Sequence, residues 1–280
     1  MPLLPIISPS NPRIKQLRAL SRRKERDATG LCVAEGIFHV GEALAAAAAN
    51  RAAVEALFYA PDRLISDFGR GLVRQASATG IPTFETAADV LATVAEKDNP
   101  QGILAVVRPR RYALADLTSA AQPWLAAVVA PQDPGNVGAI LRTLDAVGAS
   151  GLLLLDGGVD AYHPGAVRAS MGTVFRLPVV ATDFAAFIAW ARAGGYRVYG
   201  TSARGQTAYR ATEYTMPLVL LLGSEREGLS VEQAAQCDAL IRLPMHGRAS
   251  SLNLAVAAGV MLYAIHDDLA ARGLLPLPPL

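Results

Sequence analysis

Two uninterrupted apolar runs, Leu152–Leu155 and Leu218–Leu222, place the strongest constraint on how this chain can fold. A strand with one face in water alternates apolar and polar side chains, but these runs contain no polar position. They therefore predict strands that are buried on both faces, as in a parallel sheet covered by helices. Helix-like stretches separate these runs from their neighbours, which is typical of an α/β fold.

The alternation of strands and helices occurs twice along the 280 residues, a length that supports two cores. The predicted strands are 31–35, 54–60, 81–85 and 102–108 in the first half, and 124–130, 152–156, 179–181, 196–201, 218–222 and 240–243 in the second. A long last helix is predicted over 251–271. The stretch 108–119 is charged, contains proline and has no clear period. We therefore expect two α/β domains, residues 1–110 and 120–280, joined by a linker at 111–119.

Composition excludes several classes of protein. Apolar residues make up 52% of the chain and charged residues 18%, which is unlike a disordered chain. The longest membrane-like stretch, 251–265, contains Asn253 and is shorter than the ~20 residues of a spanning helix, so no membrane association is expected. The N-terminus lacks the order of a secretory signal. Cys32 and Cys237 are isolated and the four histidines are scattered, which predicts a cytoplasmic protein without a metal site.

Positive charge is concentrated at the N-terminus. Residues 1–27 contain seven lysines and arginines against two acidic residues, a net charge of 7 − 2 = +5, which leaves 2 − 5 = −3 for the rest of the chain. Such a segment can attract a polyanion, because each phosphate contact releases counterions. It can equally be a solvated helix whose charges keep it soluble.

Three loops in the second half follow predicted strands, where parallel α/β sheets bind their ligands. The first, 131–138 (PQDPGNVG), leads into a helix that carries Arg142. Asn136 either caps this helix or serves a site. The guanidinium of Arg142 can bind a phosphate or a carboxylate at two points.

The second loop, 223–230 (GSEREGLS), has the glycine spacing of a phosphate-binding loop, but Leu229 replaces the required lysine. With Glu225 and Glu227 also present, triphosphate binding is not expected. The third loop, 243–253 (LPMHGRASSLN), opens the last helix, where Ser250 or Ser251 either caps the helix or serves a site. Together the three loops predict a site for a ligand with polar ends and little net charge.

These loops resemble the three signature motifs of the SpoU (TrmH) branch of the SPOUT superfamily, whose members are 2′-O-ribose RNA methyltransferases. The motif residues are Asn136, Gly138 and Arg142 in the first loop, Gly223, Glu225, Gly228, Leu229 and Ser230 in the second, and Pro244, Met245, Gly247, Ser251, Leu252 and Asn253 in the third. The segment 170–178 resembles the stretch that joins the first two motifs in this family. Ser224 and Gly165 depart from it, since asparagine and lysine are expected there.

The first half is similar, less specifically, to the substrate-binding domain that many members carry. The matching residues are Arg26, Gly30, Glu35-Gly36, Glu42-Ala43-Leu44 and Pro100-Gln101-Gly102. The resemblance implies a ribosomal-protein-like α/β fold for this domain. For the second domain it implies a parallel sheet with a deep trefoil knot, and a homodimer formed through that domain.

The resemblance also implies the cofactor, the substrate and the site. S-adenosylmethionine would be held by Leu222, Gly223, Leu243 and Leu252, and the catalytic residues would be Arg142, Asn136, Glu225, Ser251 and Asn253. Ser251 and Asn253 would orient the ribose and the cofactor, and Glu225 would hold its loop. RNA would be bound by Arg13, Lys15, Arg18, Arg22, Arg23, Arg26, Arg168 and Ser170. Ribosomal RNA is favoured over tRNA, because relatives with the added domain often act on it.

The role of Arg142 is constrained by its chemistry. A guanidinium with a pKa above ~12 has almost no neutral form at neutral pH. We therefore expect Arg142 to grip an RNA phosphate and polarise the hydroxyl, with any role as a base confined to the assembled complex. Three alternatives stay open from the sequence: a tRNA 2′-O-methyltransferase, a non-catalytic RNA-binding protein on the same scaffold, and a nucleotide-dependent enzyme that uses the glycine loop.

Overall fold

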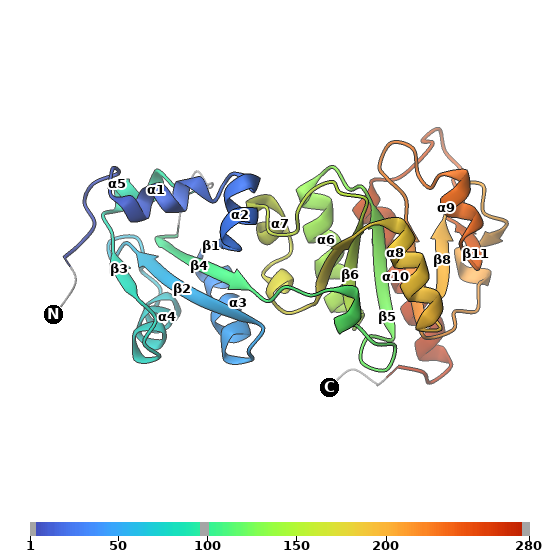
Figure 1. Ribbon diagram of the computed structural model, residues 1–280, viewed down its shortest axis with the longest axis horizontal. Helices are drawn as coiled ribbons and strands as arrows, with labels where there is room; N and C mark the ends of the chain where they lie inside the picture. The colour runs from blue at the N-terminus through green and yellow to red at the C-terminus, as the bar shows by residue number, and fades with distance from the viewer. Residues whose placement is uncertain (1–3, 96–100, 276–280) are drawn as a thin grey trace. The chain divides into compact units, whose positions relative to one another are not determined.

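A computed structural model describes residues 4–95 and 101–275 and is shown in Figure 1. Pro100, one of the residues on which the resemblance of the first half is based, lies outside the described residues. The chain forms two compact units. The first combines residues 1–110 with 160–176, and the second combines 111–159 with 177–280.

The first unit is built on a four-stranded sheet of order β1-β4-β2-β3. Its strands are β1 (Cys32–Glu35), β2 (Ala52–Tyr59), β3 (Thr83–Glu85) and β4 (Ile103–Pro109). β4 runs antiparallel to both β1 and β2, whereas β2 and β3 are parallel. The predicted α/β class is therefore confirmed here with a mixed sheet.

Helices cover both sides of this sheet. In Figure 1, α1 (Pro12–Ala19) and α5 (Ala88–Ala92) lie on one side, and α3 (Ile37–Ala48) and α4 (Asp67–Ala78) lie on the other. Ile14 and Leu17 of α1 are buried against Phe58, Phe84 and Leu104. Burial of this apolar face turns the basic side chains of α1 outward, and α2 (Arg23–Thr29) follows it directly.

The second unit is built on a seven-stranded sheet of order β7-β6-β5-β10-β8-β11-β9, in which every strand pair is parallel. The parallel sheet predicted for this part of the chain is confirmed. Its strands are β5 (Trp124–Val129), β6 (Gly151–Leu155), β7 (Val179–Thr182), β8 (Arg197–Thr201), β9 (Thr207–Ala208), β10 (Leu218–Leu222) and β11 (Ala239–Arg242). Central β10 pairs with β5 and β8, and all five of its residues are buried, as its unbroken apolar run predicts.

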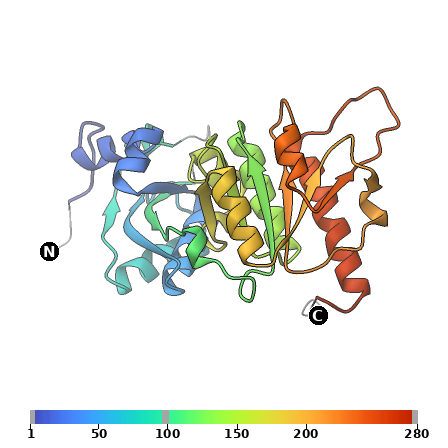
Figure 2. The ribbon, with the colours of Figure 1, turned by 45° about the vertical axis from the view of Figure 1, so that its right-hand side comes forward.

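Helices also cover both faces of the parallel sheet. Figures 1 and 2 show α8 (Phe184–Ala193) on one face, and α6 (Pro134–Ala146) and α10 (Leu254–Ala271) on the other. The remaining helices are short: α7 (Pro164–Ala169), α9 (Val231–Ala235), and the 3-10 turns η1 (Leu114–Asp116), η2 (Thr173–Phe175) and η3 (Tyr209–Ala211). Of the residues predicted as linker, 114–116 form η1.

Helix α10 is long and apolar enough to cross a membrane by length and composition, with a mean hydropathy of 1.4 over its 18 residues. Core helices of soluble proteins meet the same criterion. Ala258, Leu262 and Ile265 are fully buried, and the helix packs against α6 and β10. Its apolar character is therefore accounted for in part by the core of the second unit.

Residues 160–176 group with the first unit, so the domain predicted over 120–280 is not one continuous unit in the structure. The physical reason is polar contact over long sequence separations. Arg26 donates to the carboxylate of Asp160 at 2.5 Å, and Arg176 pairs with Glu42 at 3.3 Å. His39 contacts the carbonyl oxygen of Arg168 at 3.2 Å.

Removing the guanidinium of Arg26 is expected to destabilise the protein strongly. Only 2% of the Arg26 side chain is exposed, and it also donates to the carbonyl oxygens of Leu20 and Ser21 at 2.9 and 2.7 Å. Arg26→Ala removes the donor to Oδ2 of Asp160 and to the two carbonyl groups. We expect a loss of about 3–5 kcal/mol in the free energy of unfolding, measured by urea denaturation.

Arg23→Ala is the matched control, because Arg23 lies on the same helix and is more than half exposed, with its Nε 3.4 Å from Asp27. Its loss should change the free energy of unfolding by less than about 1 kcal/mol. Equal effects of the two substitutions would contradict the role assigned to Arg26.

Cys237 is expected to be a slow nucleophile. Burial raises the pKa of its thiol to about 11, and the neighbouring carboxylate of Asp238 acts in the same direction. Because the thiolate is the reactive form, alkylation by iodoacetamide at pH 8 should be at least about 100-fold slower than for an unstructured peptide. The rate should then rise about tenfold per pH unit towards pH 11. A native protein that is alkylated as fast as the peptide would contradict this.

Candidate active site

The three motif loops follow β5, β10 and β11, and all three strands run in the same direction in one sheet. The carboxyl ends of parallel strands lie at one edge, which is where α/β proteins bind ligands. The sheet therefore gathers at this edge loops that are far apart in sequence.

Glu225, in the loop after β10, joins the second loop to the first. Its carboxylate accepts hydrogen bonds from the backbone N–H of Gln132 at 3.1 and 3.2 Å and from that of Asp133 at 3.4 Å. The Nδ2 of Asn136 donates to the same carboxylate at 3.3 Å. A carboxylate can accept all three, because it has only acceptor positions.

Asn136 extends this network to the third loop. Its Oδ1 accepts a hydrogen bond from Nδ2 of Asn253 at 2.9 Å, so one amide group uses both its donor and its acceptor. The Oδ1 of Asn253 in turn accepts from the backbone N–H of Ala255 and Val256, at 2.9 and 3.2 Å. Glu225, Asn136 and Asn253 thus form one hydrogen-bonded chain across the three loops.

The helix caps differ from those considered for the sequence. Asp133, not Asn136, is the N-cap of α6 and accepts from the N–H of Gly135 at 2.7 Å. Asn253, not Ser250 or Ser251, is the N-cap of α10, which begins at Leu254. Capping therefore does not account for Asn136, which lies inside the helix with 8% of its surface exposed. Ser250 and Ser251 precede α10 and are exposed.

The second loop is a tight turn that needs its glycines. Ser224 and Gly228 exchange backbone hydrogen bonds of 3.1 and 3.0 Å, and Gly228 has a φ of +70°. A Cβ on Gly223 would lie 2.1 Å from the carbonyl carbon of Gly228, so no side chain fits there. Ser224, at the position where asparagine is expected, accepts a hydrogen bond from the N–H of Glu227 at 3.3 Å.

A cavity of about 630 Å³ lies beside this network, within the range of about 300–1,000 Å³ that small-molecule sites have. Leu222, Gly223, Ser251, Leu252 and Asn253 line it, as do Glu225 and Glu227. Leu243 lines an adjoining cavity of about 160 Å³ that shares Ser251 and Leu252 with the first. The structure thus brings together the four residues predicted to hold the cofactor.

The chemistry of the lining suits S-adenosylmethionine. Leu222 and Leu252 offer apolar surface for a flat ring. The hydroxyl groups of Thr201, Ser202 and Ser251 offer partners for polar ends, and Glu225 and Glu227 add negative charge to the lining, which favours a cationic ligand. Thr201 and Ser202 were not singled out from the sequence. Their position at the carboxyl end of β8 is the signal that could have identified them.

Arg142 is not among the residues that line the cavity. It lies six residues after Asn136 on α6, and at 100° per residue this turns it about 240° around the helix axis. Its side chain is exposed and has no ion pair or hydrogen bond with any residue in the described part of the chain. A single chain therefore presents this guanidinium to solvent rather than to its own cavity.

The residues predicted to bind RNA lie in the first unit. Arg13, Lys15, Arg18, Arg22, Arg23 and Arg168 are exposed. Arg26 and Ser170 require a correction, because neither can contact RNA from its place in this structure. Arg26 is buried in its ion pair with Asp160, and Ser170 is fully buried with its hydroxyl donating to the carbonyl of Val167 at 2.8 Å.

A parallel α/β sheet with a polar network and a cofactor-sized cavity at its carboxyl edge defines an enzyme of the nucleotide- or cofactor-binding α/β class. Comparison with known families narrows this class. Residues 124–263 match the model of the SpoU rRNA methylase family, and residues 11–105 match the MRM3-like substrate binding domain. The chain belongs to the SpoU rRNA methylase family, and its fold is that of a two-part SPOUT methyltransferase.

Two relatives align over nearly the whole chain. The 23S rRNA (guanosine(2553)-2′-O)-methyltransferase RlmP of Bacillus subtilis is 31% identical over 92% of this chain and 97% of its own length. The 23S rRNA (uridine(2479)-2′-O)-methyltransferase of Streptomyces viridochromogenes is 32% identical over 95% of this chain and 93% of its own.

Two solved structures of methyltransferases superpose on nearly the whole chain. The AdoMet-bound rRNA methyltransferase of Sinorhizobium meliloti superposes with a TM-score of 0.85 at 36% identity, covering 98% of this chain and 99% of that one. The AviRb methyltransferase of Streptomyces viridochromogenes in complex with AdoMet superposes with a TM-score of 0.82 at 30% identity, covering 93% of this chain and 100% of that one.

Glu225→Gln is expected to disrupt the site while the fold persists. The amide group turns one acceptor into a donor, which then faces the N–H groups of Gln132, Asp133 and Asn136. We expect the affinity for S-adenosylmethionine to fall at least tenfold, measured by isothermal titration calorimetry, with methyltransferase activity lost in parallel.

Glu213→Gln is the matched control, since Glu213 lies in the same unit, is 78% exposed and pairs with Arg272. It should leave cofactor affinity unchanged. Unchanged affinity in both variants would show that Glu225 does not organise the cavity.

Proposed function

We propose that this protein transfers a methyl group from S-adenosylmethionine to a ribose 2′-hydroxyl of ribosomal RNA, with 23S rRNA as the expected substrate. The observation that carries the proposal is the hydrogen-bonded chain of Glu225, Asn136 and Asn253 beside a cavity of cofactor size. The names of both full-length relatives, which are 23S rRNA 2′-O-methyltransferases, support the choice of RNA and of atom.

S-adenosylmethionine supplies an electrophilic methyl group when it is bound. The protein then has to align the ribose oxygen with that methyl group and stabilise the loss of the hydroxyl proton. Ser251, exposed at the cavity wall, is suited to orient the ribose, and Asn253 fixes the start of α10 beside it. Arg142 is proposed to hold the phosphate next to the target ribose and to polarise the hydroxyl.

We assign RNA binding to the first unit. The buried face of α1 directs the cations of that helix outward, and Arg13 is additionally fixed by stacking 4.3 Å above the ring of Phe84. Arg22 and Arg23, at the start of α2, are also exposed. The ion pairs of Arg22 with Glu25 and of Arg23 with Asp27 are exposed, so solvent weakens them and phosphates can compete. This division of labour gives RNA binding to the predicted domain 1–110 together with residues 160–176, and catalysis to the rest of the predicted domain 120–280.

We further propose that the protein acts as a homodimer in the cytoplasm, with the C-terminal trefoil knot of its family. Val256, Val260 and Tyr263 on α10 are between 37% and 52% exposed, which leaves an apolar strip available for a partner. Arg142 does not line the cavity of its own chain, and a second copy offers another cavity that it can serve. The active site is therefore proposed to be completed across the dimer.

Arg142→Lys tests the role of the guanidinium. Lysine keeps the charge but cannot make the two-point contact with a phosphate. We expect kcat to fall at least about 100-fold while the Kd for S-adenosylmethionine stays within about twofold, measured with tritiated cofactor on 23S rRNA. Turnover near that of the unmodified protein would refute the proposed phosphate grip.

Mixing two inactive variants tests whether Arg142 acts across the dimer. Arg142→Ala and Glu225→Gln chains are unfolded together and refolded, so that mixed dimers form. If Arg142 serves the partner's cavity, each mixed dimer has one intact site, and about a quarter of the unmodified activity should return. No return of activity, with mixed dimers shown to be present by native mass spectrometry, would show that Arg142 acts within its own chain.

A further inference from the structure

The cofactor cavity of about 630 Å³ and the adjoining cavity of about 160 Å³ differ in charge. Among the described residues, no charged side chain lines the smaller cavity. Four apolar side chains line the smaller cavity and not the larger one: Ile241, Leu243, Met245 and Met261. Four charged side chains line the larger cavity and not the smaller one: Arg204, Glu225, Arg226 and Glu227. Charge is therefore confined to one of the two adjoining cavities.

The wall that both cavities share is uncharged. It is formed by residues 201–203, residues 250–252 and Ala257. The two cavities thus offer an apolar region, a shared uncharged wall and a charged region. S-adenosylmethionine has its groups in the same order, because its sulfonium joins the adenosine to an amino-acid end that carries both an ammonium and a carboxylate group.

Three of the four charged side chains have no partner among the described residues. Glu225 is occupied by the hydrogen bonds that hold the first loop. The side chains of Arg204, Arg226 and Glu227 make no hydrogen bond or ion pair with any residue in 4–95 or 101–275. Arg204 and Glu227 line one cavity with opposite charges, and a ligand that carries one charge of each sign can pair with both.

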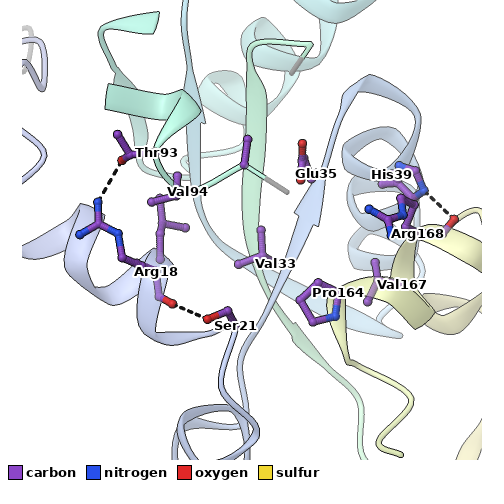
Figure 3. Close-up of a pocket in the computed structure, with 12 residues that line it drawn as sticks. Arg18, Ser21, Val33, Glu35, His39, Thr93, Val94, Pro164, Val167 and Arg168 are labelled. Atoms are coloured by element: carbon purple, nitrogen blue, oxygen red, sulfur yellow. Dashed lines mark hydrogen bonds between the residues drawn. The ribbon is translucent and has the colours of Figure 1, made fainter. Parts of the chain in front are cut away.

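A cavity of about 230 Å³ in the first unit, shown in Figure 3, provides a contrast. Its charged side chains already have interaction partners. Nη2 of Arg18 donates to Oγ1 of Thr93 at 3.0 Å, and Glu35 and Arg168 also interact with other residues. No ligand is needed to satisfy these charges, whereas the cofactor cavity has charges that a ligand can satisfy.

The backbone that carries Arg204 is held in place by a turn after β8. The N–H of Gly205 donates to the carbonyl oxygen of Ser202 at 3.0 Å, and the N–H of Arg204 donates to the Ser202 hydroxyl at 3.2 Å. A Cβ on Gly205 would lie 2.8 Å from the carbonyl oxygen of Leu240, so the turn packs closely against β11. A guanidinium on a fixed turn requires less ordering when it binds a ligand.

Glu227 is carried by the glycine turn after β10. Its N–H donates to the hydroxyl of Ser224 at 3.3 Å, within the turn that Ser224 and Gly228 close. Residues 222–229 line the larger cavity and not the smaller one. Glu227 therefore offers the charged region a carboxylate that Glu225, bound to the first loop, cannot offer.

We propose that Arg204 binds the carboxylate and Glu227 the ammonium group of the amino-acid end of S-adenosylmethionine, with the adenine ring in the smaller cavity. The inference rests on the proposed function in that the ligand is S-adenosylmethionine. Its sulfonium would then lie at the shared wall, which contains Ser251, the residue proposed to orient the target ribose. Arg204 and Glu227 are positioning residues for the methyl donor.

The test uses the full-length protein and three neutral-sulfur analogues, with Kd values measured by isothermal titration calorimetry. S-adenosylhomocysteine has the whole amino-acid end, S-adenosyl-3-thiopropylamine keeps the ammonium but lacks the carboxylate, and 5′-methylthioadenosine lacks both. We expect the unmodified protein to bind S-adenosylhomocysteine at least about 50-fold more tightly than 5′-methylthioadenosine, because two charge-assisted contacts are lost with the amino-acid end. Equal affinity for these two ligands would overturn the proposal.

Variants assign the two contacts. Arg204→Met should weaken binding of S-adenosylhomocysteine at least about tenfold and should not weaken binding of the two analogues that lack the carboxylate. Glu227→Gln should weaken binding of both ligands that carry the ammonium group. Affinity for 5′-methylthioadenosine should stay within about twofold in each variant, which shows that the cavity is intact.

Arg197→Met is the matched control. Arg197 is an exposed arginine at the amino end of β8, whereas Arg204 follows the carboxyl end of that strand, and Arg197 lines neither cavity. Its loss should leave all three affinities unchanged. An equal effect of Arg197→Met and Arg204→Met would overturn the proposal, as would a loss of S-adenosylhomocysteine affinity in Arg226→Met but not in Arg204→Met.

Binding and methylation of 23S rRNA are measured alongside. Weaker RNA binding by Arg204→Met with unchanged affinity for S-adenosylhomocysteine would assign Arg204 to an RNA phosphate and overturn the proposal. Ribose methylation by the unmodified protein, with cofactor affinity that does not depend on Arg204 or Glu227, would refute this inference alone. The expected pattern of cofactor affinities without methylation of any ribose would refute the proposed function alone.

Discussion

The site depends on the hydrogen bonds that the carboxylate of Glu225 accepts. This carboxylate lies between loops that are 89 residues apart in sequence, and Asn136 passes the connection on to Asn253, 117 residues further along the chain. Each polar group in this chain of contacts is hydrogen-bonded to the next, so the loss of one side chain leaves its neighbour without a hydrogen-bond partner. The cavity wall, the start of α6 and the start of α10 are thereby fixed by one network.

The parallel sheet brings together the three loops that form this network. The buried run of β10 holds the centre of the sheet, β5 lies directly beside it, and β11 is separated from it by β8 alone. Strand direction sends all three motif loops to one edge, and the glycine turn after β10 then aims Glu225 at the first loop. Fold and site are therefore linked through strand order, and loops that are distant in sequence become one binding surface.

Much of this could be predicted from the sequence, because unbroken apolar runs report burial directly. The bounds of β10 agree with its run, and the resemblance to the family's motifs indicated Leu222, Gly223, Ser251 and Leu252, which line the cavity. The sequence-based prediction was wrong where contacts with residues far away in the sequence determine whether a side chain is buried or caps a helix. Nothing in the local sequence distinguishes Arg26 from its exposed neighbours, since its burial depends on Asp160. Likewise α10 is capped by Asn253, whose side-chain amide is bonded to Asn136, 117 residues away in the sequence. The two-residue strand β9 is too short to have a periodic signal.

The Glu225–Asn136–Asn253 site is proposed to direct methyl transfer to a ribose oxygen of ribosomal RNA. The most direct test is to incubate the protein with tritiated S-adenosylmethionine and 23S rRNA, hydrolyse the RNA with alkali, and identify the labelled product by mass spectrometry. A 2′-O-methyl group blocks alkaline cleavage at its own nucleotide, so the label should appear in one alkali-resistant dinucleotide. Label in a mononucleotide with a methylated base, or no label at all, would contradict the account.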